Sequence, residues 1–393
     1  MSAMAALHCR TRHMMLPQRA GGRQRRECYR GEHDANKAGY APVRGRNGLS
    51  GVRKIAILDD YIGVALDYGD WTALPDDAEI TVYRQAIPPE RLAAELSDYE
   101  IVVITQQRAR FPRAVLEGLP NLKLIVCNGR TSNVIDHEAR IERGILLCGT
   151  ADTAQAAPAR PPGYQTPRGL PSPSEMAWAL ILAVAKRIGI EDRVIRAGGW
   201  QTGFPLPLAG KTLGLLGAGN LGGAMVPVAK AFGMDVVAWS QNLTEERCAE
   251  LGVRKVTKDE LLSSADVLGV FLVFSERSRN TLRADDLAKM KRGAILVNIS
   301  RGPIVEEAAL IDALRSGHLA GAGLDVFDRE PLPADHPFRS LDNVVVSPHV
   351  GYVTEHLFRS AWQRMAEDVA AYLAGAPIRV VTDPADCPPM APQ

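Results

Sequence analysis

Residues 212–222 read TLGLLGAGNLG, and this stretch decides the fold predicted for the chain. Its first five residues have the short apolar character of a buried strand, and the three glycines that follow have the spacing GxGxxG. A helix is expected next, because one stripe of a 3.6-residue period is apolar: Leu221, Met225, Val228 and Phe232. Strand, glycine turn and helix in this order predict a dinucleotide-binding unit.

Each glycine of the motif has its own physical task. Gly217 permits a tight turn, Gly219 lets the backbone approach a pyrophosphate, and Gly222 lets helix and strand pack closely. The helix N-terminus would then hold the negative charge. A glycine-rich turn without a ligand is the alternative. Pro227 lies inside the expected helix and should kink it, since proline removes one backbone hydrogen bond.

Apolar runs alternate with helical patterns on both sides of this motif, which predicts a parallel sheet buried on both faces. One helical pattern, Glu306–Arg315, ends before Gly317. The strands expected in this half are Thr212–Leu216, Val236–Trp239, Val267–Val273, Ala294–Asn298, Ala322–Val326 and Val344–Ser347.

The chain before residue 150 shows the same alternation, with helical patterns at Pro89–Leu96 and Ala114–Leu119. The strands expected there are Lys54–Leu58, Ile80–Tyr83, Ile101–Thr105, Leu122–Cys127 and Ile145–Cys148. The fold class predicted is therefore α/β, with two doubly wound parallel-sheet domains and a cleft between them.

Residues 151–173 hold six prolines, which predicts a linker or insertion without regular structure. A buried helix is expected at Glu175–Ile188, and a last helix at Glu355–Leu373 follows the end of the second sheet.

The stretch 1–54 carries 12 Lys and Arg against 3 Asp and Glu, whereas the rest carries 34 against 42. Residues 1–51 show no apolar period, so we expect a disordered basic extension there. A targeting or nucleic-acid-binding arm and an over-long gene start are the alternatives. The mildly acidic body argues against binding to nucleic acid.

Six scattered cysteines form no CxxC pair, which predicts a reducing cytoplasm and no structural metal. The longest apolar stretch, Met176–Ala185, is far shorter than the about 20 residues of a membrane span.

Ser240 follows the second strand expected in this half of the chain, at the position where an NAD site would place an acidic residue for the ribose hydroxyls. A hydroxyl does not repel a 2′-phosphate, yet no Arg follows at once to bind one. The choice between NAD and NADP stays open at this point.

Three polar residues each come after a predicted parallel strand, at the sheet edge where ligands bind: Arg301, Glu330 and His349. All three stand after the glycine motif in the chain. Glu330 follows Arg301 by 29 residues, and His349 follows Glu330 by 19 residues. Taken singly, each has an ordinary structural alternative, such as a surface ion pair or a solvated turn.

In this order and spacing, the motif and the three residues resemble the D-isomer-specific 2-hydroxyacid dehydrogenases, over about residues 52–381. The resemblance implies a flavodoxin-like substrate domain formed by residues 52–150 and 350–393. It implies a Rossmann NAD(P)-binding domain at 174–349, and hydride transfer between NAD or NADP and a small 2-oxo or 2-hydroxy acid.

The resemblance also implies a role for each site residue. His349 would be the general acid or base, Glu330 would orient its ring and stabilise its charged form, and Arg301 would bind the substrate. The substrate carboxylate would further meet the loop residues Gly129, Arg130 and Thr131. The cofactor would meet Gly217, Gly219, Asn220, Leu221, Gly222, Ser240, Ser300, Asp325 and Gly351, with Asp325 bonded to the nicotinamide carboxamide.

The resemblance also implies a homodimer formed through the dinucleotide-binding domains. It implies no binding to a membrane. Phe271 departs from the family, since it stands where many relatives carry His. A non-catalytic regulator that senses dinucleotides on the same fold is the main alternative, and an interaction protein with a vestigial site is another.

Overall fold

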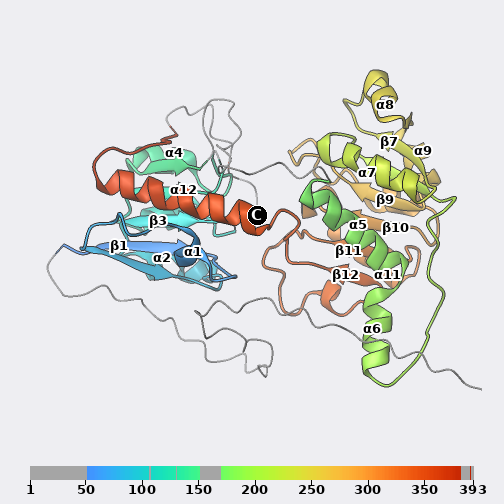
Figure 1. The fold of residues 1–393 in the computed structure, drawn as a ribbon, viewed down its shortest axis with the longest axis horizontal. Coiled ribbons are helices and arrows are strands. Elements are labelled where there is room, and N and C mark those ends of the chain that lie inside the picture. The colour runs from blue at the N-terminus through green and yellow to red at the C-terminus, as the bar shows by residue number, and fades with distance from the viewer. Residues whose placement is uncertain (1–50, 106–107, 130, 151–169, 382–389, 391–393) are drawn as a thin grey trace, which may run out of the picture. The chain divides into compact units, whose positions relative to one another are not determined.

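Two separate parallel sheets organise the chain (Figure 1). The structure is a computed structural model, and it describes residues 51–105, 108–129, 131–150, 170–381 and 390. The basic extension expected at 1–51, except for its last residue, and most of the linker at 151–173 therefore lie outside the described residues. Within the described part, no helix is long and apolar enough to cross a membrane.

The first sheet has five parallel strands in the order β2-β1-β3-β4-β5. Its residues alternate between two cores: Ile101 and Val103 face one, and Val102 and Ile104 face the other. Both faces are buried, as the apolar runs predicted. The strands are β1 Arg53–Leu58, β2 Ala78–Val82, β3 Ile101–Ile104, β4 Leu124–Cys127 and β5 Leu146–Gly149.

Five helices belong to this sheet, and the last of them comes from the C-terminal end of the chain. Helix α12 lies over the sheet (Figure 1) and buries Phe358, Trp362 and Met365 against Ile55 and Ile57 of β1. The helices are α1 Ala65–Tyr68, α2 Pro89–Leu96, α3 Arg113–Glu117, α4 His137–Glu142 and α12 Glu355–Leu373.

The second sheet has seven parallel strands in the order β12-β11-β10-β9-β6-β7-β8. The chain leaves β6 on one side and returns to its other side with β9, so the strand order reverses between these two strands. Ligands of such sheets bind where this reversal occurs, outside the carboxyl ends of the strands. The strands are β6 Thr212–Leu216, β7 Asp235–Trp239, β8 Arg254–Lys255, β9 Val267–Val270, β10 Ile295–Asn298, β11 Gly321–Leu324 and β12 Val344–Val346.

The second sheet also has a core on each face, since Leu296 of β10 faces one core and Ile295 and Val297 face the other. Its helices are α5 Ser172–Ala185, α6 Ile188–Arg196, α7 Asn220–Ala231, α8 Glu245–Leu251, α9 Lys258–Ser264, α10 Ala284–Lys289 and α11 Glu307–Arg315. Two short 3₁₀ helices, Gly302–Ile304 and Pro337–Arg339, complete this part.

Three expectations about element bounds are corrected. Helix α5 begins at Ser172 and not at Glu175, so Ser172 and Pro173 are helical and not part of an irregular linker. Proline fits the first turn because its missing N–H would have no partner there. Strand β9 ends at Val270 and not at Val273, and α5 ends at Ala185 and not at Ile188. Pro227 lies inside α7, which ends at Ala231.

Candidate active site

The glycine turn between β6 and α7 has the geometry that its sequence predicted. Gly217 has a φ of 101°, and a Cβ there would lie 2.9 Å from the Phe271 carbonyl carbon. Its N–H donates to the Trp239 carbonyl oxygen at 2.9 Å. A Cβ on Gly222 would lie 2.1 Å from the Gly217 carbonyl oxygen, so the helix can approach the turn only with glycine at that position.

Gly219 has a different environment, since a Cβ there would meet nothing within 4 Å. It caps α7 without a side-chain hydrogen bond, so the first N–H groups of this 12-residue helix remain available to a ligand. Asn220 is exposed beside it, and the Leu221 carbonyl accepts a hydrogen bond from Ser174 at 3.1 Å. Open space and free N–H groups fit the pyrophosphate of a dinucleotide.

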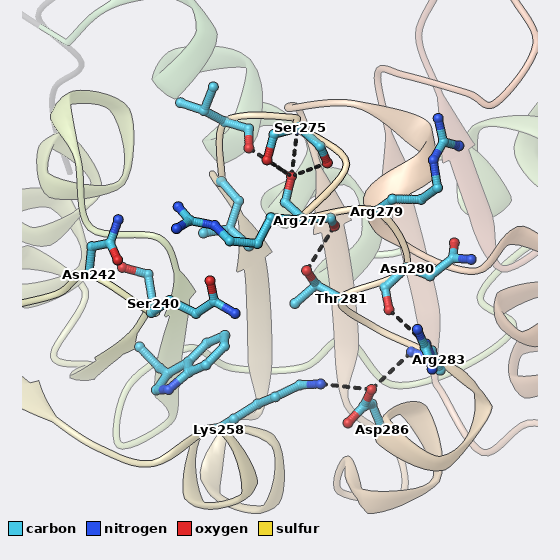
Figure 2. Close-up of a pocket in the computed structure, with 15 residues that line it drawn as sticks. Ser240, Asn242, Lys258, Ser275, Arg277, Arg279, Asn280, Thr281, Arg283 and Asp286 are labelled. Atoms are coloured by element: carbon cyan, nitrogen blue, oxygen red, sulfur yellow. Dashed lines mark hydrogen bonds and ion pairs between the residues drawn. The ribbon is translucent and has the colours of Figure 1, made fainter. Parts of the chain in front are cut away.

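Ser240 lies directly after β7 and lines a cavity of about 610 Å³ (Figure 2). The cavity also borders the segment that follows β9, so it lies at the carboxyl ends of two strands of the second sheet. This is the position that the sequence predicted for the ribose end of the cofactor.

His349 and Glu330 form a hydrogen-bonded pair. The two atoms His349 Nδ1 and Glu330 Oε2 are 2.6 Å apart, and the side chains are 15% and 18% exposed. Because an ionised carboxylate only accepts, Nδ1–H donates and Nε2 is left for a substrate. His349 has a φ of 54°, a left-handed conformation that is uncommon for a side chain larger than glycine.

Glu330 has two further partners that keep it ionised. Its Oε1 accepts from the Phe327 N–H at 3.1 Å, and Arg108 Nε lies 3.9 Å from Oε2. Burial alone would raise the pKa of Glu330. The hydrogen bond and charge of His349, the Phe327 N–H and the charge of Arg108 outweigh it, and the pKa is lowered.

Arg108 is a site residue that the sequence analysis missed. Its side chain is 10% exposed, and its Nη2 donates to the Pro348 carbonyl oxygen at 3.2 Å. It therefore contacts Glu330 directly, and it also contacts Pro348, the residue that precedes His349. Arg108 stands far from both in sequence and follows no motif, so no spacing signal could have found it.

Asp325 lies at the end of β11 and is 1% exposed. Its Oδ1 accepts from Ser347 Oγ at 2.6 Å and from the Val350 N–H at 2.9 Å. Its Oδ2 accepts from the Gly351 N–H at 2.9 Å. The carboxylate thus holds the Ser347 side chain before His349 and two backbone N–H groups after it, a positioning role beyond the cofactor contact that the family resemblance implied.

Arg301 follows β10 in a turn held by Asn298. The Asn298 side chain donates to the Arg301 carbonyl at 2.9 Å and accepts from the Ser300 N–H at 3.0 Å. Ser300 Oγ donates to the Leu272 carbonyl. The Arg301 side chain is exposed, and its Nη1 donates to the Ser300 carbonyl at 2.7 Å.

Gly302 is the reason that this turn can approach the turn after β11. A Cβ on Gly302 would lie 2.1 Å from the Phe327 carbonyl carbon and 2.4 Å from the Asp328 nitrogen. The close approach brings the backbone after Arg301 to the segment that leads to Glu330.

Tyr352 lies against the pair and is a second residue that the sequence analysis missed. Its ring meets that of His349 edge to face, with 5.4 Å between centroids. Burial raises the pKa of Tyr352 to about 12, and the charges of Arg108, Glu330, Arg301 and Asp325 also act on it. Charged groups from several segments therefore surround one ring.

In the loop after β4, the structure shows that one N–H group already has a partner. Gly129 has a φ of 112°, but its N–H already donates to Thr150 Oγ1 at 2.9 Å, so this N–H is not free for a substrate carboxylate. The Thr131 hydroxyl lies 3.5 Å from His137 Nε2. Arg130 lies outside the described residues. In the described part of the chain, no group of three His, Cys, Asp or Glu side chains could hold a metal.

Comparisons with known proteins decide the family. Residues 178–351 match the model of the "D-isomer specific 2-hydroxyacid dehydrogenase, NAD binding domain". A hydroxypyruvate reductase from Blautia hydrogenotrophica is 31% identical over 344 residues, which cover 84% of this chain and 99% of that protein. The chain belongs to the D-isomer specific 2-hydroxyacid dehydrogenase family. The cofactor class predicted from the sequence, NAD or NADP, is thereby confirmed.

Other relatives of this dehydrogenase agree. A D-3-phosphoglycerate dehydrogenase from Archaeoglobus fulgidus is 32% identical over 328 residues, which cover 83% of this chain but 58% of that protein. The solved structure of a phosphoglycerate oxidoreductase from Vibrio cholerae has a TM-score of 0.71 and 30% identity. It covers 82% of this chain and 100% of that chain.

Proposed function

We propose that this dehydrogenase reduces a small 2-oxo acid, or oxidises the matching D-2-hydroxy acid, with a nicotinamide cofactor. The observation that carries the proposal is the His349–Glu330 pair, placed after the strands of the sheet that also bears the glycine turn. When bound, the nicotinamide supplies or accepts the hydride. Proton transfer and substrate binding fall to the side chains of the chain itself.

His349 is the proton donor in reduction. Hydride arrival places negative charge on the carbonyl oxygen of a 2-oxo acid, so a proton has to be delivered there. Nδ1 is held by Glu330, which leaves Nε2 for the substrate as the acid in reduction and as the base in oxidation. Glu330 stabilises the charged ring, and Asp325 and Arg108 position the pair.

Arg301 binds the substrate through its carboxylate and carbonyl oxygens. Its guanidinium can donate two hydrogen bonds in one plane, which matches two oxygens of an acid. Its exposure leaves the group accessible to a substrate. Glycine-turn residues and Asn220 would hold the pyrophosphate, and Ser240 would face the adenosine ribose.

The test is a panel of 2-oxo acids, including glyoxylate and hydroxypyruvate, assayed with NADH and NADPH through the nicotinamide absorbance. We expect turnover of at least one acid and the D-hydroxy acid as product. Relatives named hydroxypyruvate reductase and D-3-phosphoglycerate dehydrogenase motivate the choice of acids. Tight cofactor binding with no turnover of any acid would instead support the regulator that senses dinucleotides.

We also propose that the enzyme acts as a homodimer. Helix α6 projects past the β12 edge of the second sheet (Figure 1), and this segment exposes four large apolar side chains. They are Ile188 at 57%, Ile195 at 56%, Trp200 at 71% and Phe204 at 100% exposed. Several large apolar side chains exposed in one short segment are typical of a protein interface, and a second copy supplies the same surface.

Phe204→Glu should therefore weaken the dimer about tenfold or more, since truncated aromatic anchors carry much of an interface. Mass measured by light scattering over a concentration series checks this. Ile141→Glu is the matched control, because Ile141 is 49% exposed on α4 of the other sheet. If the wild-type protein is a monomer, or if Phe204→Glu leaves the dimer unaffected, this surface is not a dimer interface.

The cytoplasm remains our proposal for the compartment. Cys148 and Cys248 are buried free thiols, and burial raises the pKa of the Cys148 thiol to about 12. Such thiols behave as small apolar side chains and suit a reducing environment.

A further inference from the structure

The cavity beside Ser240 has walls from four segments of the second sheet (Figure 2). One wall is the segment after β7, with Ser240, Gln241 and Asn242. The opposite wall is the segment after β9, and the starts of α9 and α10 complete the cavity. A ligand there would meet polar side chains at the carboxyl ends of the strands.

The charge of this cavity is strongly positive. Four basic side chains line it, Lys258, Arg277, Arg279 and Arg283, against one acidic side chain, Asp286. Such a lining attracts an anion with several negative charges, such as a phosphate monoester.

Most of the basic groups are already engaged. Lys258 Nζ pairs with Asp286 at 2.8 Å, and Arg279 pairs with Glu276 at 3.2 Å while its guanidinium lies over the Phe274 ring. The Arg283 Nε donates to the Asn280 carbonyl at 3.3 Å.

Arg277 is different, since neither an ion pair nor a side-chain hydrogen bond joins it to any residue that the structure describes, whereas Arg283, which also makes no ion pair there, is held by the Asn280 carbonyl. Its side chain is exposed and extends from the segment after β9 toward the segment that carries Ser240 and Asn242 (Figure 2). It is therefore the cation of this cavity that an incoming anion can engage without breaking an existing pair.

We infer that this cavity binds the 2′-phosphate of NADP, with Arg277 as the residue that determines cofactor preference. Ser240 stands where a carboxylate would bind the ribose hydroxyls and repel a phosphate, and a serine hydroxyl carries no charge that would repel one. The Asn242 amide and the Ser240 hydroxyl are further hydrogen-bond donors on the facing wall. This inference rests on the proposed function in one respect: the dinucleotide has to lie across the glycine turn.

Direct binding tests the inference without turnover. Calorimetry on the full chain would compare NADPH with NADH, and adenosine 2′,5′-bisphosphate with 5′-AMP. We expect the ligand with a 2′-phosphate to bind about tenfold or more tightly in each pair, from one charge-assisted contact. Equal affinities within both pairs would overturn the inference.

Arg277→Gln should remove most of this difference and leave the Kd of NADH unchanged. Arg279→Gln is the matched control, because Arg279 lines the same cavity but is held by Glu276 and Phe274; its effect should stay within about threefold. An unchanged NADPH Kd in Arg277→Gln would overturn the assignment of this residue.

Ser240→Asp gives the reciprocal result. A carboxylate at this position would repel the phosphate, so the Kd of NADPH should rise while that of NADH does not. A flat ratio of the two affinities would contradict the inference. Absence of 2-oxo acid turnover together with the expected binding pattern would count against the proposed reaction alone.

Discussion

His349→Ala is expected to lower kcat for 2-oxo acid reduction by about 100-fold or more, the usual contribution of a positioned general acid. The methyl group cannot deliver a proton to the developing alkoxide. The Kd of the cofactor should change little, because the printed partners of the ring, Glu330 and Tyr352, lie outside the glycine turn. Steady-state kinetics and cofactor titration on the same preparation check both statements. Turnover close to wild type would remove His349 from the reaction.

Glu330→Gln tests the pair through pH and not through rate alone. Reduction requires the proton on His349, and the Glu330 carboxylate stabilises that charged form across 2.6 Å. Glutamine keeps the shape but not the charge. Reduction by the variant should therefore fail at a lower pH than in the wild type, while its activity at acidic pH is largely retained.

The lowered pKa of Glu330 also affects how the stability of the fold depends on pH. A carboxyl group whose pKa is lowered by folding stabilises the fold above the ordinary carboxyl pKa of about 4.3, and this contribution disappears as pH falls through the lowered value. The wild-type pair should therefore stay intact through the pH range of the assay.

A matched control exists elsewhere in the same domain. His336 Nε2 and Glu307 Oε1 are 2.9 Å apart in a second histidine–carboxylate pair outside the candidate site. Glu307→Gln should leave the alkaline limb of kcat/KM unmoved. If Glu330→Gln also leaves it unmoved, Glu330 does not stabilise the protonated ring, and the pairing has no role in proton transfer.

Arg301→Lys should reduce kcat/KM for the 2-oxo acid by about 10- to 100-fold although the positive charge is kept, since hydrogen bonds to charged groups contribute about 1.5–3 kcal/mol each. Lysine is a point charge and cannot donate two hydrogen bonds in one plane. The turn itself should persist, because Asn298 holds it through backbone groups.

The control for this change is Arg315→Lys, at an exposed position in the last turn of α11. It should leave kcat/KM within the error of the assay. Wild-type kinetics in Arg301→Lys would show that the guanidinium does not contact the substrate.

Local sequence patterns predicted the strands and the glycine turn well. The strand Thr212–Leu216 and the helices Pro89–Leu96 and Glu355–Leu373 have the predicted bounds, because apolar period and end signals coincide there. Strand β8 has two residues and offers no period to detect. Strand β9 was predicted too long because the apolar run continues through Leu272 and Val273, beyond Phe271, whose N–H still donates to the Leu216 carbonyl of β6 at 2.8 Å.

The candidate site was predictable where a residue follows its own strand, as Arg301, Glu330 and His349 do. It was not predictable where a group arrives from elsewhere in the fold. The residues just after Ser240 hold no Arg for a phosphate, whereas Arg277 comes from the segment after β9, a strand that β6 separates from β7. Arg108 comes from the first half of the chain and was missed for the same reason.

The three hydrogen bonds that Asp325 accepts determine which sheet would carry the acid–base pair in any interdomain motion. Asp325 directly follows β11, Glu330 comes five residues later, and Ser347, Val350 and Gly351 donate hydrogen bonds to the Asp325 carboxylate. The imidazole would therefore move with the dinucleotide-binding sheet, although α12 packs on the other sheet. Arg108 comes from the first half of the chain, so it would have to release Glu330 and Pro348 in any such motion.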